Sequence, residues 1–154
     1  MIVDVIHEER YWYPDDGGEL WLAGYTPVDA GGRYLGRDAP ELAARGLRVA
    51  TVAGAGRHHA EALASDAAAP GRPLVLRRDA ANEHDANAIA VDGGGAQLGW
   101  VPRDLAAELA GELDAGRRWA AIALREQRRS PRDPRTGLTM LLAAGTGIEL
   151  RVRG

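Results

Sequence analysis

The chain of 154 residues is 45% apolar and 27% charged, carries a formal net charge of −3 and contains no cysteine. This composition is ordinary for a single globular domain and argues against disorder, and the lack of cysteine excludes disulfides, thiolate catalysis and zinc sites that use cysteine. No apolar run approaches the ~20 residues of a membrane span and the polar start lacks the order of a signal peptide, so we expect a cytoplasmic protein with no membrane partner.

Residues 1–47 are expected to form an N-terminal extension, a hairpin followed by a short helix, that packs on the main domain. Aromatic and apolar residues lie on both sides of the sequence DDGG at 15–18, a pattern that predicts a tight hairpin turn. Asp38 is placed as the helix N-cap with Glu41 as its capping-box partner, and Gly46 is placed as the stop.

The remainder, residues 48–154, is expected to form the main domain and to be mainly β. Short β-compatible segments, each bounded by Gly, Pro, Asp or Asn, predict an all-β barrel or sandwich; they cover residues 48–54, 73–78, 87–91, 97–101, 118–124, 139–144 and 148–152. One main helix is predicted over residues 102–115, because leucines recur at every fourth residue and a glycine follows. The apolar stripe of that helix is expected to pack on one mouth or face of the barrel.

The chain is basic from the start of the fifth segment to the loop before the sixth, since residues 117–135 hold seven arginines against Glu126 and Asp133. A local positive field can bind a polyanion even in a chain of negative net charge. A hairpin kept soluble by its charges explains the pattern equally well. Arg128 and Arg129 are the candidate contacts to nucleic acid in this segment.

A crowd of polar side chains precedes a short apolar run; it comprises Asn82, Glu83, His84, Asp85 and Asn87. One interpretation is structural, since Asn and Asp form Asx-turns at the entry of a strand. A second is a small polar pocket, in which Asp and Asn bond a ligand hydroxyl or base edge while the imidazole offers a flat face for stacking. A metal site is a weaker alternative, because adjacent residues on a strand alternate between its faces.

Two further candidates lie near other predicted strand ends. Arg57, His58 and His59 follow the first strand of the main domain, where Arg suits a phosphate and His suits stacking; the alternative is an exposed strand end. Arg103 stands at the start of the predicted helix, where an anion is physically reasonable and where pairing with a nearby carboxylate is the alternative. Clusters at neighbouring strand ends favour a shared groove.

No catalytic set is visible in the sequence. It has no nucleophile elbow, no phosphate-binding GxxxxGK motif and no dinucleotide fingerprint after a strand. We therefore expect a binding module without a cofactor or a metal, and not an enzyme.

The succession TVAGAGRHH, GRPLVLRRDAANEHDANAIAV and AQLGWVPRDLAAELAGELDAG resembles the HIRAN domain over about residues 48–152. That family has a strand that ends in Gly before an aromatic or His pair, an Asn-x-aromatic-Asp-x-Asn-Ala segment, and a Gly-aromatic-Val-Pro-Arg segment that leads into a helix. The central part, residues 74–114, agrees in order, spacing and residue type. His84 stands where the family usually has Tyr or another aromatic residue.

The resemblance implies an OB-like barrel of six antiparallel strands that binds single-stranded DNA. In eukaryotic fork-remodelling ATPases, the domain captures a free 3′ end. By position, Asp85 would accept a hydrogen bond from the terminal hydroxyl and Asn82 would support the pocket. His84, with His58 or His59, would stack on the last nucleotide, and Arg57 would lie near the phosphates.

The expected partner is therefore single-stranded DNA with a free 3′ end, in repair or replication-fork processing, with a helicase or nuclease acting in trans as a further candidate. Two alternatives from other classes stay open, and the oligomeric state is open with them. One is an adaptor that binds a protein or itself through the aromatic residues of the extension, Tyr11, Trp12, Tyr13, Trp21 and Tyr25. The other, more remote, is a metal-dependent hydrolase that uses His58, His59, His84 and Asp85.

Overall fold

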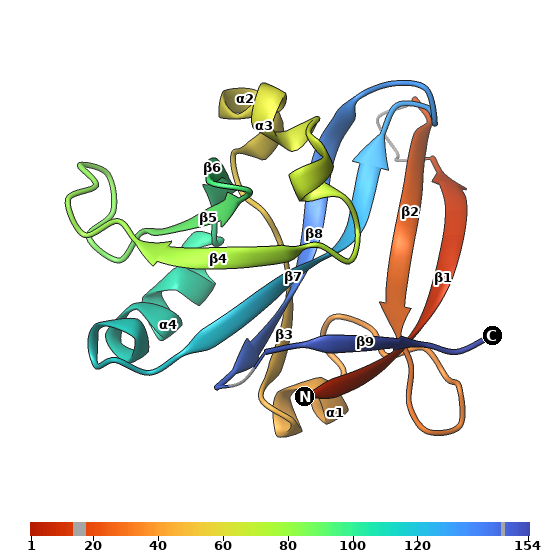
Figure 1. Cartoon of the computed structure of the whole chain (residues 1–154), viewed down its shortest axis with the longest axis horizontal. Coiled ribbons are helices and arrows are strands. Elements are labelled where there is room, and N and C mark those ends of the chain that lie inside the picture. The colour runs from red at the N-terminus through yellow and green to blue at the C-terminus, as the bar shows by residue number, and fades with distance from the viewer. Residues whose placement is uncertain (14–17, 146) are drawn as a thin grey trace.

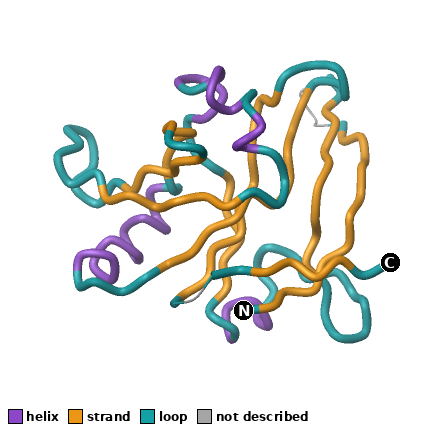
Figure 2. Tube along the Cα trace, viewed as in Figure 1, coloured by secondary structure: helices purple, strands orange, loops and turns teal. Residues whose placement is uncertain are grey.

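Nine strands carry the fold in the computed structural model, which describes residues 1–13, 18–145 and 147–154 (Figures 1 and 2). The strands are β1 (Ile2–Trp12), β2 (Leu20–Pro27), β3 (Leu47–Thr51), β4 (Pro73–Arg78), β5 (Ile89–Gly93), β6 (Ala96–Trp100), β7 (Trp119–Arg128), β8 (Arg135–Ala144) and β9 (Glu149–Val152). The helices are α1 (Pro40–Ala44), α2 (Ala55–His58), α3 (Ala60–Leu63), the 3-10 turn η1 (Asp66–Ala68) and α4 (Arg103–Asp114).

Six strands form a ring in the order β3-β8-β7-β4-β5-β6, with every pair antiparallel. The ring closes between Ala53, just after β3, and Trp100 at the end of β6, whose backbones exchange N–H···O bonds of 2.7 and 2.9 Å. Gly99 makes this closure possible, because a Cβ at that position would lie 2.4 Å from the carbonyl oxygen of Ala53. The expected mainly β, OB-like class is confirmed, and the described residues form nine strands because β1, β2 and β9 join the six of the barrel.

The inside of the ring is filled by an apolar cluster to which α4 contributes Ala106 and Leu109, with Leu105 and Leu113 packed at its margin. The helix predicted at residues 102–115 is therefore present, and its leucine stripe faces the barrel as expected. Pro102 takes the N-cap position instead of the first helical turn, and the chain leaves the helix through Gly116 at φ +84°.

The outer face of β7 and β8 is covered by the N-terminal extension. Side chains alternate along β7, so that Ala121 and Ala123 point into the barrel cluster while Ile122 and Leu124 join a second cluster with Val3, Val5, Leu42 and Leu47. β2 pairs with the second half of β7, and β1 pairs with β2 on one side and, in parallel, with β9 on the other. The division into residues 1–47 and 48–154 stays a prediction, since the sheet runs across that boundary.

The predictions for the N-terminal extension are confirmed in part. The N-terminal hairpin is present, but the residues expected to turn it lie largely outside the described part of the chain. The short helix α1 also forms and is followed by Gly46 at φ +73°, yet Ala39 is its N-cap and no side chain caps it, so the assignment of Asp38 and Glu41 to a capping box is wrong. Pro40 starts the helix instead, since its fixed φ suits the first helical position.

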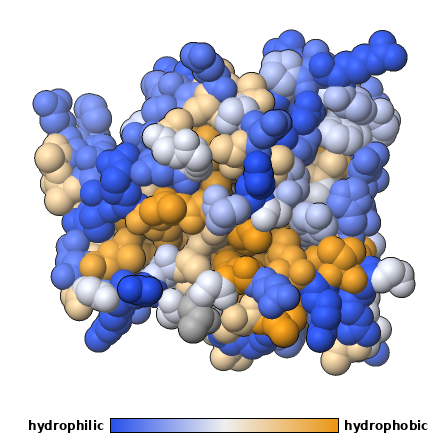
Figure 3. Space-filling view, viewed as in Figure 1, coloured by the Kyte–Doolittle hydropathy of each residue, from blue (hydrophilic) through white to orange (hydrophobic). Residues whose placement is uncertain are grey.

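The surface has two apolar areas on the face shown in Figure 3, one around β9 and one between β4 and α4. In the extension, Tyr11, Trp12 and Tyr13 are at least half exposed, while Trp21 and Tyr25 are half-buried within the sheet. No helix in the described ranges is long and apolar enough to cross a membrane.

Candidate functional site

The polar loop between β4 and β5 is built by its own side chains. Asn82 Oδ1 accepts hydrogen bonds from the backbone N–H groups of His84 (2.9 Å) and Asp85 (3.1 Å), and Asn82 Nδ2 donates to Asp79 Oδ2 at 3.0 Å. Asp85 Oδ1 in turn accepts from the N–H of Asn87 at 2.8 Å. The structural interpretation of this segment, Asx-turns that lead into a strand, is therefore observed. One oxygen of Asp85 is left outside these bonds.

Arg78, the last residue of β4, fixes the end of the same loop. Its guanidinium donates to the carbonyl oxygens of Ala88 (2.7 Å) and Ala86 (2.9 Å) and to Asp114 Oδ1 on α4 (2.9 Å). The hydrogen bond to Asp114 raises the pKa of Arg78 above its ordinary value, against the opposing effect of burial. Arg78 was not among the predicted site residues, although its place directly before a polar loop is a signal that the sequence contains.

A pocket of about 320 Å³ opens beside this loop at the point where the ring closes. It is lined by Ala53, His58, Asn82, His84, Asp85, Ala88, Trp100, Val101 and Arg103. These residues come from the end of β3, α2, the polar loop, the end of β6 and the start of α4. We call this hollow the end pocket. Its volume is at the lower limit of small-ligand sites, ~300–1,000 Å³.

The apolar wall of the end pocket is aromatic. The ring centroids of His58 and Trp100 lie 6.2 Å apart with an interplanar angle of 81°. Gly54, at φ +74°, turns the chain into α2 against Trp100, and a Cβ at Gly54 would come within 3.0 Å of the indole ring. Trp100 is only partly buried and lines the pocket. Three flat rings, with His84 as the third, thus face one hollow.

The charged rim consists of Asp85 and Arg103. Arg103 Nε lies 3.8 Å from Asp85 Oδ2, beyond normal hydrogen-bond distance, and Arg103 Nη2 donates to the carbonyl oxygen of His84 at 3.4 Å. The side chain of Asp85 is 21% exposed and that of Arg103 is 77% exposed. Asp85 Oδ2 is therefore able to accept a hydrogen bond from a ligand hydroxyl, while Arg103 can reach an anion outside the pocket.

The structure thus gathers five of the ten predicted site residues in one hollow: His58, Asn82, His84, Asp85 and Arg103. The other five, Arg57, His59, Asn87, Arg128 and Arg129, do not line it.

The alternative interpretation of residues 57–59 as an exposed strand end is wrong, because Arg57 and His58 belong to α2 and His59 is its C-cap. Gly56 packs so closely on β8 that a Cβ there would lie 2.5 Å from the carbonyl oxygen of Thr136. His58 is the histidine of the pair that faces the end pocket, and Arg57 lines a neighbouring cavity. His59 packs edge-on against Trp100, with ring centroids 5.2 Å apart, and its Nε2 is buried without a hydrogen-bond partner among the described residues.

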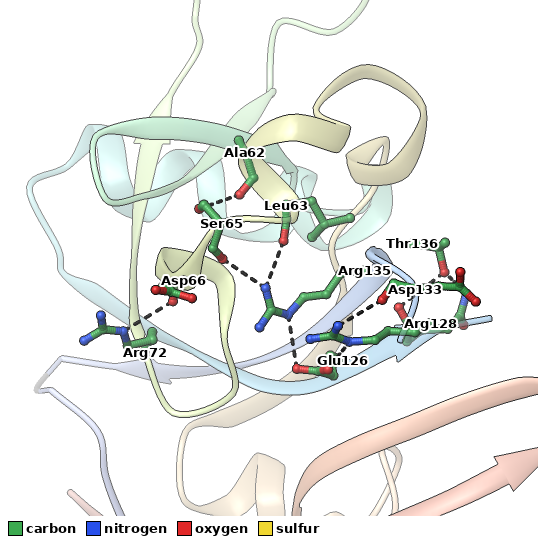
Figure 4. A network of polar contacts seen from close by, with 11 residues as sticks. Ala62, Leu63, Ser65, Asp66, Arg72, Glu126, Arg128, Asp133, Arg135 and Thr136 are labelled. Atoms are coloured by element: carbon green, nitrogen blue, oxygen red, sulfur yellow. Dashed lines mark hydrogen bonds and ion pairs between the residues drawn. The ribbon is translucent and has the colours of Figure 1, made fainter. Parts of the chain in front are cut away.

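Part of the basic segment serves the fold (Figure 4). Glu126, which is 6% exposed, forms ion pairs with both Arg128 and Arg135. Arg128 also donates to the carbonyl oxygen of Asp133 at 2.9 Å, and Arg135 donates to that of Ser65 at 2.9 Å. Arg135 therefore links the segment after α3 to β8. A hairpin kept soluble by its charges does not account for Arg128 and Arg135, because both are bonded within the fold. Arg129 is exposed.

Within the described ranges, no group of three or more His, Asp or Glu side chains is arranged to hold a metal ion. The set His58, His59, His84 and Asp85 is split, since His59 does not line the pocket that holds the other three.

Similarity to known proteins is found over the part of the chain that forms the barrel and the end pocket. The family model of the HIRAN domain matches residues 47–136. A protein from Lactobacillus plantarum, known from its crystal structure, shares 26% sequence identity with this chain. The two structures superpose with a TM-score of 0.51, over 64% of this chain and 92% of that one. The crystal structure of the HIRAN domain of human HLTF is 22% identical with a TM-score of 0.47, over 65% of this chain and 77% of that one. No curated protein matches the sequence.

The matched range spans β3 to the start of β8 and includes all residues of the end pocket. More than half of the chain fits the family model, so the chain belongs to the HIRAN family of nucleic-acid-binding domains.

Proposed function

We propose that this protein binds single-stranded nucleic acid, preferring DNA with a free 3′-hydroxyl, and holds the last nucleotide in the end pocket. The observation that carries the proposal is the end pocket itself: three flat rings, one available carboxylate oxygen and one exposed arginine converge on a hollow of about 320 Å³. Each of these groups suits a different part of a terminal nucleotide.

The rings of His58, His84 and Trp100 offer faces or edges to a base, and stacking contributes ~1–3 kcal/mol per base without demanding a sequence. Asp85 Oδ2 accepts from the terminal hydroxyl, a charge-assisted hydrogen bond of ~1.5–3 kcal/mol. Arg103 neutralises a phosphate at the pocket rim. A 3′-phosphate would place its negative charge against Asp85, so the same carboxylate disfavours a phosphorylated end.

The loop that presents Asp85 is already ordered by Asn82 and Arg78 in the free protein. A preorganised pocket loses little conformational entropy when the ligand enters. The role proposed for this protein is recognition without catalysis, in which it marks a 3′ end for a helicase or nuclease acting in trans during repair or replication-fork processing.

Fluorescence anisotropy with two labelled oligonucleotides of one sequence tests the proposal, one ending in a 3′-hydroxyl and the other in a 3′-phosphate. We expect the hydroxyl end to bind about tenfold more tightly or better, since ~1.4 kcal/mol is a factor of ten and the hydrogen bond alone is of that size. Equal affinity for both ends would remove the 3′-end preference. No binding at low salt would remove nucleic-acid binding altogether.

A further inference from the structure

A second and larger hollow, of about 1150 Å³, lies between the N-terminal extension and the barrel. Its walls include Arg10 and Trp12 of β1, Leu22 of β2, Arg37 before α1 and Arg125 of β7. Figure 1 shows the β1–β2 ribbon on one side of β7 and β8, and α2 with the rest of the barrel on the other. We call this hollow the arginine cleft. The HIRAN family model begins at residue 47, so the walls supplied by the extension lie outside it.

Three guanidinium groups of the arginine cleft form no direct ion pair with a carboxylate of the described residues. Among the described residues, no carboxylate lies within ion-pair distance of Arg10, Arg37 or Arg125. Arg37 donates only to the hydroxyl of Thr51, at 3.3 Å, and Arg125 donates to the carbonyl oxygen of Tyr25, at 3.3 Å. Burial, followed by the charges of Arg10 and Arg37, lowers the pKa of Arg125, against the opposing effect of the Glu8 carboxylate. Three mutually repelling guanidinium groups therefore face a hollow that has room for an anion.

The acids nearest to this cluster already have other partners. Glu126 is paired with Arg128 and Arg135. Glu8 accepts hydrogen bonds from the hydroxyl groups of Thr26 (2.9 Å) and Tyr34 (3.1 Å). Glu8 lines an adjacent hollow with the same three arginines and offsets part of their positive charge, but it forms no ion pair with any of them. The cluster therefore keeps a net positive charge, and an incoming phosphate would not displace an existing ion pair.

An exposed indole completes the arginine cleft. Trp12 is 51% exposed and lies two residues from Arg10 on β1, so both side chains point to the same face of the sheet. Leu22, the cross-strand partner of Arg10, extends this apolar area. A basic groove with an exposed aromatic ring is the combination by which proteins hold single strands without reading their sequence.

The arginine cleft and the end pocket are neighbours, because His58 lines both. Arg57, on the same short helix, lines the cleft. A strand whose last nucleotide occupies the end pocket can therefore pass His58 and continue directly into the cleft.

We propose that the arginine cleft binds the upstream part of the same strand, with phosphates on Arg10, Arg37 and Arg125 and a base stacked on Trp12. The N-terminal extension thus lengthens the nucleic-acid footprint of the barrel. This inference rests on the proposed function and adds to it a second contact region outside the matched family range.

The test compares, in the full-length chain, a trinucleotide with an oligothymidylate of about 12 residues, within the ~4–16 nucleotides that an OB-fold site covers. Both end in a 3′-hydroxyl and are measured at several salt concentrations. Arg37→Gln and Trp12→Leu are the cleft variants. Arg33→Gln is the matched control, because Arg33 is exposed in the same loop as Arg37 but does not line the cleft.

We expect the longer strand to bind the unmodified chain at least tenfold more tightly than the trinucleotide. Each cleft variant should weaken binding of the longer strand about 3- to 10-fold, while the trinucleotide and the Arg33→Gln control stay unchanged. Arg37→Gln should also reduce the slope of log affinity against log salt by about 0.7, the value for one phosphate contact on a single strand.

The outcomes separate the two proposals. If both strands bind equally and the cleft variants match the control, the cleft proposal is overturned while the end pocket stands. If neither strand binds, the proposed function fails and the cleft proposal falls with it. If an acidic polypeptide of equal charge binds as tightly as the longer strand and is weakened equally by both variants, the cleft is a general polyanion surface and the proposal is overturned.

Discussion

Replacement of Asn82 by alanine tests whether the polar loop is the scaffold of the end pocket. The variant removes two hydrogen bonds that Asn82 Oδ1 accepts from the backbone of His84 and Asp85, and a third that Nδ2 donates to Asp79. At ~0.5–1.5 kcal/mol net for each bond the three together contribute about 3 kcal/mol. Water replaces part of this at the partly exposed loop, so we expect the free energy of unfolding to fall by about 1–2 kcal/mol.

The assay is urea unfolding followed by tryptophan fluorescence, with anisotropy on a 3′-hydroxyl strand as the second readout. Asn87→Ala is the control, since the side chain of Asn87 is exposed and makes no hydrogen bond among the described residues. It should stay within ~0.5 kcal/mol of the unmodified chain. Asn82→Ala should also weaken strand binding about tenfold, because the backbone that aims His84 and Asp85 becomes free to move. If the two variants behave alike in both assays, the loop does not depend on Asn82 and the reasoning is wrong.

Three further predictions concern the framework. Glu126→Ala should lower the free energy of unfolding by about 3–5 kcal/mol, because it leaves the buried Arg135 without its carboxylate; a loss below ~1 kcal/mol in urea unfolding would contradict this. The hydrogen bond from Arg151 holds the pKa of Asp4 below 3.8, so this contribution to stability is complete above pH 3.8 and is lost as the pH falls through the lowered pKa. Asp4→Asn should therefore lower stability at pH 7 and flatten its decline in acid, and an unchanged acid profile would refute the link. A chain cut to residues 48–154 should self-associate in light scattering, since it exposes the second apolar cluster; a monomer with sharp, cooperative unfolding would show that the extension is dispensable.

Much of the barrel could be predicted because its strands are short and are punctuated by turn residues. The hairpin between β5 and β6 turns on Gly94 and Gly95, both at positive φ, and the leucine stripe of α4 marks the face that packs on the barrel. β7 and β8 are longer than predicted, at ten residues each, since their polar ends pair in the structure with each other and, for β7, with β2. Pairing with a distant strand leaves no periodic signal in a segment rich in Arg.

The candidate site was predictable where its residues are close in sequence and was missed where they are not. Asn82, His84 and Asp85 lie in one loop, and their residue types alone predicted either a polar pocket or an Asx-turn. In the structure, Asn82 and Asp85 stabilise the loop by hydrogen bonds, and all three residues line the pocket. The α2 helix has only four residues and depends on packing against β8, which a local pattern does not contain. Arg37 and Arg125 come together only through the sheet, so the arginine cleft had no signature in the sequence.

The central claim is that the carboxylate at position 85 distinguishes a hydroxyl from a phosphate at the end of a strand. The most direct measurement is the ratio of the two dissociation constants, 3′-phosphate over 3′-hydroxyl, for the unmodified chain, Asp85→Asn and Asp104→Asn. Asp104 is an exposed acid at the start of α4 that does not line the end pocket, so its variant removes the same charge nearby. We predict a ratio of about ten or more for the unmodified chain and for Asp104→Asn, and a ratio near one for Asp85→Asn. An Asp85→Asn protein that keeps the full ratio would contradict the account.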